Sequence, residues 1–72
     1  MDDLSDLSDE DFWLITVVNN VRNMGQDLSP DTADQVAHLA ARGLVATDQD
    51  GHFIPSDVQW RLMRVGRILK RT

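Results

Sequence analysis

Apolar residues recur at helical spacing between Asp9 and Met24. At 100° per residue, one face of this segment is apolar and the opposite face is polar. The apolar face collects Leu14, Val17, Val18, Val21 and Met24. Ser8 precedes three acidic residues, as is typical of a helix start, and Gly25 suits a helix end. We therefore predict a helix over residues 9–24 whose apolar face belongs to the core.

Two bulky apolar residues of this segment, Phe12 and Ile15, fall outside that face. Phe12 projects among polar residues, and Ile15 lies at the border of the apolar face. Such positions indicate cover by a neighbouring element or by a second subunit. Phe12 and Ile15 are therefore our candidate contacts of a homodimer.

The middle of the chain carries signals for a second helix and a β-hairpin. Ser29 and Pro30 are typical of a helix start and Gly43 of a helix end, which predicts a helix over residues 30–42. Residues 44–47 and 52–54 flank Asp50 and Gly51, a pair that favours a tight turn between strands. We expect the two flanking segments to form the hairpin.

A last helix is expected from residue 56 to about residue 70. Pro55 ends the second strand, and Ser56 with Gln59 matches a capping box. Its core face comprises Val58, Leu62, Val65 and Leu69. Around the other side lie the candidate partner-binding residues, which are Trp60, Arg61, Arg64, Arg67, Lys70 and Arg71.

Arginines around a tryptophan can bind the phosphates of DNA or an acidic protein surface. Two other interpretations of this basic side stay open. It is a solvated helix face, or the acidic residues among positions 2–11 lie against it.

The length of 72 residues allows one domain, because so short a chain cannot form two cores. We assign residues 1–8 to an acidic, flexible tail and residues 9–72 to a single α+β domain. Its expected order is helix, helix, β-hairpin, helix. No apolar run approaches the roughly 20 residues that cross a bilayer, and no basic signal start is present. We expect a cytoplasmic protein without a membrane partner.

The charge is unevenly distributed along the chain. The formal net charge is −5, with eleven acids and two arginines in residues 1–54. Residues 55–72 hold five basic residues and one acid. The overall acidity argues against nucleic acid as partner, whereas the basic C-terminal segment argues for an anionic one.

The residues that usually perform catalysis are scarce. The chain has no cysteine, and its only histidines are His38 and His52. No glycine-rich phosphate loop or metal-ligand spacing occurs, and Val58 stands where a calcium loop beginning at the hairpin turn would need glutamate. We expect no enzymatic activity, cofactor, metal or small-molecule substrate.

The segment Leu39-Ala40-Ala41-Arg42-Gly43-Leu44-Val45, followed by the hairpin with Asp50-Gly51, resembles the winged-helix superfamily. The resemblance covers residues 29–71 and is to bacterial or phage transcription regulators. It implies a helix-turn-helix unit, DNA binding and a dimer, with Gln35, His38 and Arg42 as candidate DNA-reading residues. The family pattern has three helices before the wing, whereas only two are expected here.

Two functional hypotheses follow. The resemblance favours a DNA-associated transcriptional regulator that uses the helix over residues 30–42 and the basic last helix. The alternative is a protein-interaction module, an inhibitor or adaptor, that keeps a winged-helix frame without binding DNA. The acidic composition favours this alternative.

Overall fold

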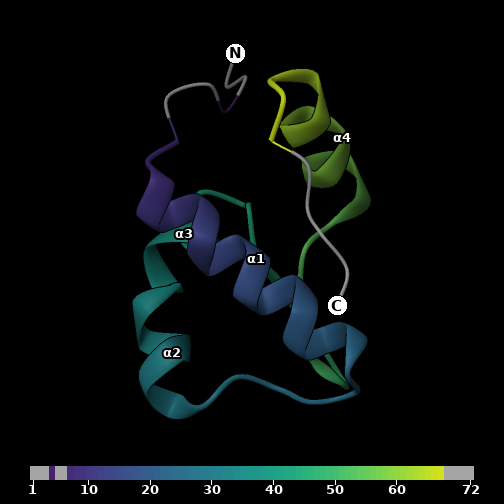
Figure 1. Ribbon diagram of the computed structural model, residues 1–72. Helices are drawn as coiled ribbons and strands as arrows, with labels where there is room; N and C mark the ends of the chain where they lie inside the picture. The colour runs from purple at the N-terminus through teal and green to yellow at the C-terminus, as the bar shows by residue number, and fades with distance from the viewer. Residues whose placement is uncertain (1–3, 5–6, 68–72) are drawn as a thin grey trace.

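The computed structural model describes Leu4 and residues 7–67, and this part of the chain forms a small α+β domain (Figure 1). In chain order its elements are α1 (Asp9–Asn23), α2 (Pro30–Gln35), α3 (Ala37–Ala41), β1 (Ala46–Asp48), β2 (Gly51–Phe53) and α4 (Ser56–Arg64). In Figure 1, α1 crosses the domain with α2 and α3 on one side and α4 on the other. The expected α+β class is confirmed, with one helix more than expected.

The starts of the first two helices follow the local capping signals. Ser8 Oγ accepts a hydrogen bond from the Asp11 amide at 3.1 Å. Ser29 Oγ accepts one from the Thr32 amide at 3.4 Å, and Pro30 is the first residue of α2. Both predicted helix starts are confirmed.

The single helix expected over residues 30–42 is divided into α2 and α3. The division falls at Val36, whose φ of −93° and ψ of 0° leave the helical region. No glycine or proline marks this position, so no local signal predicts the division. Among the apolar residues from Val36 to Ala41, Val36 and Leu39 are buried, whereas Ala37, Ala40 and Ala41 are exposed.

The end of α3 is formed by Gly43, as predicted. Its φ is +79°, and the Leu44 amide donates to the Leu39 carbonyl at 3.0 Å. This bond can form only when the backbone of Gly43 adopts the left-handed conformation. For residues with a Cβ atom, that conformation is sterically unfavourable.

We expect Gly43→Val to lower the free energy of unfolding by more than about 1 kcal/mol, because a β-branched residue is strained at this φ. A Cβ atom here would meet nothing within 4 Å, so the cost comes from the backbone alone. Urea denaturation of both proteins measures it. A valine variant as stable as the wild type would show that the helix end tolerates another backbone conformation.

The hairpin pairs three residues on each strand. Ala46 pairs with Phe53, Thr47 with His52, and Asp48 with Gly51, leaving a two-residue turn. The Asp50 amide donates to Asp48 Oδ1 at 2.9 Å and closes this turn. The first strand begins two residues later than expected and the second one residue earlier, and Leu44, Val45 and Ile54 beside them are buried in the core.

Helix α4 begins at Ser56, as expected, but its N-terminal cap and its end differ from expectation. Pro55 is the N-cap, and Ser56 makes no capping bond, so the expected capping box is wrong. Gln59 Nε2 donates instead to the Ile54 carbonyl at 3.0 Å. At the other end, Gly66 has a φ of +80°, and the Arg67 amide donates to the Leu62 carbonyl at 2.9 Å. The helix therefore stops at Arg64, short of the expected residue 70.

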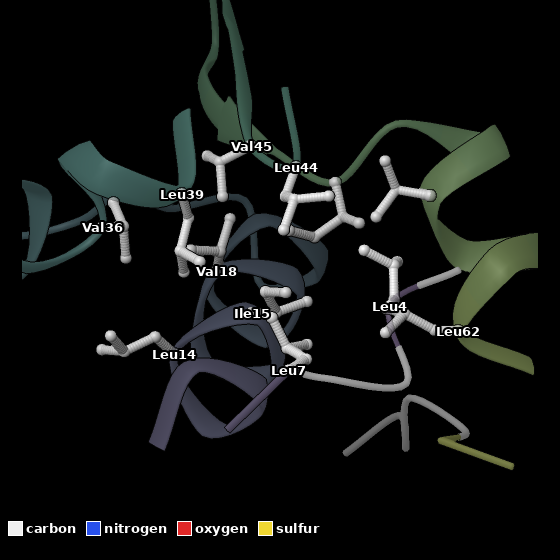
Figure 2. Packing of buried hydrophobic residues seen from close by; sticks show 12 residues of the cluster. Leu4, Leu7, Leu14, Ile15, Val18, Val36, Leu39, Leu44, Val45 and Leu62 are labelled. Carbon is white, nitrogen blue, oxygen red and sulfur yellow. The ribbon is translucent and has the colours of Figure 1, made fainter. Parts of the chain in front are cut away.

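The core is one cluster to which α1, α3 and α4 contribute, together with Leu4, Leu7, Val36 and the buried residues beside the hairpin (Figure 2). Helix α1 buries Leu14 and Val18 as expected, but its buried face is rotated toward Ile15, which is fully buried, and away from Met24, which is 57% exposed. Within the segment assigned to a tail, Leu4 and Leu7 are 0% and 2% exposed and lie among the cluster side chains of Figure 2. These two leucines therefore belong to the core.

Candidate functional site on helix α4

The outward face of α4 carries the most exposed aromatic side chain of the described residues. Trp60 is 65% exposed and Met63 is 51% exposed. Arg64 is also exposed and forms no ion pair with any residue that the structure describes. At three- and four-residue spacing these side chains are neighbours on the helix surface. We call Trp60, Met63 and Arg64 the α4 surface.

The inner face of α4 holds this surface in place. Val58 and Leu62 are fully buried in the core, and they lie opposite Trp60 at 100° per residue. The bond from Gln59 to the Ile54 carbonyl fixes the first turn against the end of the hairpin. The α4 surface is thus presented by a helix whose rotation is set by packing.

A shallow hollow lies beside Trp60. It is lined by Ser56, Gln59, Trp60 and Met63 and encloses about 250 Å³. Its walls combine an aromatic ring and a thioether with a hydroxyl and an amide. Such a hollow can receive one apolar side chain of a partner while its polar rim makes hydrogen bonds.

The other basic residues expected on this face are distributed differently. Arg61 lies 3.4 Å from Asp57, one turn earlier in α4. Arg67 follows the helix end and turns toward α1, where its guanidinium lies 5.4 Å from the centre of the Phe12 ring and 3.8 Å from Asp9. Lys70 and Arg71 lie outside the described residues.

The two candidate dimer contacts are covered within the domain. Ile15 is fully buried and cannot reach a second subunit. Phe12 packs against the core and is covered by Arg67. Among the described residues, Asp9 near the N-terminus lies 3.8 Å from Arg67 of the basic segment, as expected if acidic residues lie against that segment.

The candidate DNA-reading residues lie on two different helices. Gln35 is the last residue of α2, His38 lies in α3, and Arg42 is its C-cap. All three are exposed. His38 Nε2 donates to Asp11 Oδ1 at 2.8 Å, because an ionised carboxylate can only accept. The structure therefore gives these residues no continuous helix from which to enter a groove.

A polar cluster at the hairpin turn was missed by sequence reasoning. Arg22 donates from both terminal nitrogens to Asp48, at 2.8 and 2.7 Å, and lies 5.3 Å from the centre of the Phe53 ring. These hydrogen bonds lower the pKa of Asp48 to about 2. The contact joins residues 26 positions apart, and no local pattern signals it.

Asp27 completes this cluster, which we call the hairpin anchor (Arg22, Asp27, Asp48 and His52). Asp27 Oδ1 accepts from His52 Nδ1 at 2.9 Å, from the His52 amide at 3.0 Å and from the Leu28 amide at 2.8 Å. These bonds, the His52 side chain first, lower the pKa of Asp27 to about 2. The anchor ties the end of α1 and the following loop to the hairpin.

Comparison with protein-family models, curated proteins and solved structures finds no match. Function must therefore be argued from the surface itself. Each helix in the described part of the chain is too short or too polar to cross a bilayer. Within the same residues, no group of three or more histidine or acidic side chains is placed to hold a metal ion.

Proposed function

We propose that this chain is a non-enzymatic protein-interaction module that binds an acidic segment of a partner protein through the α4 surface. The observation that carries the proposal is the exposed Trp60, beside Met63 and Arg64, on a helix whose opposite face is fixed in the core. Tryptophan and arginine are the residues most enriched among those that dominate protein interfaces.

The chemistry of the partner follows from the charges around Trp60. Arg64 makes no ion pair with the described residues. It can therefore pair with a partner carboxylate without first breaking such an ion pair. The hollow between Ser56, Gln59 and Met63 accepts an apolar side chain next to that carboxylate. The partner segment therefore combines an acidic residue with a neighbouring aromatic or aliphatic one.

A winged-helix DNA regulator is the second hypothesis. The order of three helices followed by a hairpin supports it, since the family pattern has three helices before the wing. Against it, α3 has five residues, and Asp31 and Asp34 in α2 would repel a phosphate backbone. At the hairpin turn, Arg22 is already bound to Asp48. We therefore rank protein binding above DNA binding.

The test is a selection of peptides from a random display library on the immobilised full chain. We expect the selected peptides to be enriched in aspartate or glutamate next to an apolar residue. Trp60→Ala and Arg64→Glu should each weaken binding of such a peptide by at least about tenfold. Trp13→Ala is the matched control, because Trp13 is 60% exposed but lies on α1.

The same proteins should be titrated with a labelled DNA duplex at low and high salt. Peptides that bind the Trp60 and Arg64 variants as well as the wild type would overturn the proposal, as would a selection without acidic enrichment. Duplex binding that falls steeply with salt, without peptide selection, would replace it with the DNA hypothesis.

A further inference from the structure

Helix α1 carries a wider apolar surface than the core buries. Leu14, Ile15 and Val18 are buried. On the outer side, Trp13 is 60% exposed and Met24 at the C-cap is 57% exposed. An isolated domain gains nothing from leaving both of these side chains in water.

Two further apolar residues connect Trp13 to Met24. Val17 and Val21 are half-buried and continue the line at spacings of four, four and three residues. At 100° per residue the four positions fall within about 80° of one another and extend over about 16 Å of helix. We call Trp13, Val17, Val21 and Met24 the outer stripe.

The outer stripe is free of charge along its length. Between Trp13 and Met24 the one charged residue is Arg22, which points to the hairpin and binds Asp48. The flanking polar residues are uncharged and comprise Thr16, Asn20 and Asn23. The acidic residues of the first turn of α1, which include Asp9 and Glu10, lie beyond one end of the stripe.

We propose that the outer stripe binds the same stripe of a second copy of this chain, with the two α1 helices antiparallel. Self-association places identical surfaces against each other, so a charged surface repels itself. This disfavours the basic α4 surface and the acidic α2 helix, whereas the uncharged outer stripe meets no such repulsion.

The antiparallel direction follows from the two ends of the stripe. It keeps the acidic first turns of the two helices at opposite ends of the contact, whereas a parallel pair would bring them together. It also sets Trp13 of each copy against Met24 of the other, and a thioether packs favourably on an aromatic ring. One helix pair is a small interface, so we expect association that is weak and depends on concentration.

Sedimentation equilibrium over a series of concentrations tests the proposal. The wild type should pass from the 8.1 kDa monomer toward twice that mass as concentration rises. Trp13→Glu and Met24→Glu should each remain monomeric with unchanged circular dichroism, since both side chains are more than half exposed. Trp60→Glu, with a similarly exposed tryptophan on α4, should associate like the wild type.

A wild type that stays monomeric throughout would overturn the proposal. So would a Trp60→Glu variant that loses association, or Trp13→Glu and Met24→Glu variants that keep it. These results are independent of peptide binding by the α4 surface, because the two tryptophans lie on different helices and each serves as the control for the other.

Discussion

Replacement of Leu4 by alanine should lower the free energy of unfolding by about 2–5 kcal/mol, the range for truncation of a fully buried leucine. Leu4 is 0% exposed and belongs to the same cluster as Ile15 and Leu62. In a domain of this size the core is thin, so one leucine is a large share of the total stability. Urea denaturation followed by circular dichroism measures the change.

Two comparisons make this result specific. Leu7→Ala should cost a similar amount, because Leu7 is 2% exposed and belongs to the same cluster. Met63→Ala removes an apolar side chain that is 51% exposed and should change stability by less than about 0.5 kcal/mol. A Leu4→Ala variant as stable as Met63→Ala would show that Leu4 is no part of the folded core.

The burial of Leu4 also shows where sequence reasoning reached its limit. The acidic residues around it dominate the composition of residues 1–11 and indicate a solvated tail. The composition of a segment describes its average polarity, whereas burial in the core is decided for each side chain separately. Leucines at positions 4 and 7 are too few for a periodic pattern, so their burial became visible only with the three-dimensional packing.

Features set by neighbouring residues were predictable. Ser8, Ser29 and Gly43 act within one helical turn, and the hairpin turn needs only the residues between Asp48 and Gly51. Gly66 carries the same kind of signal as Gly43 and ends α4 in the same way. The apolar spacing in the sequence nevertheless continues past Gly66 to Leu69, and spacing alone does not reveal a helix end.

The face that α1 buries could not be read from periodicity alone. Apolar residues surround most of this helix, so the choice between Ile15 and Met24 depends on where the other elements lie. The hairpin anchor also depends on how distant elements pack, since it joins Arg22 of α1 to Asp48 of the hairpin. The exposure of Trp60 and Arg64 could be predicted, because both residues lie opposite the apolar face of α4.

Acidification should destabilise the domain through the hairpin anchor. Asp27 and Asp48 each have a pKa of about 2 in the folded chain, against an ordinary value of 3.8. The unfolded chain therefore takes up protons first as the pH falls. The stability from both groups is fully present above about pH 4 and is lost as the pH drops toward about 2. Urea denaturation at a series of pH values follows this loss.

Substitutions separate the acid-induced loss of stability into the parts that come from Asp48 and from Asp27. Asp48→Asn should lower stability at neutral pH and bring the curve to meet that of the wild type near pH 2, because its share is lost at every pH. Arg22→Met should remove the larger part of the Asp48 slope, since the bonds from Arg22 are the main cause of the low pKa of Asp48, and the backbone bonds from Asp50 and Gly51 keep the rest. Both variants should keep the slope due to Asp27, whose low pKa comes from His52 and Leu28. If Arg22→Met kept the full slope of the wild type between pH 4 and 2, Arg22 would not hold the hairpin through Asp48.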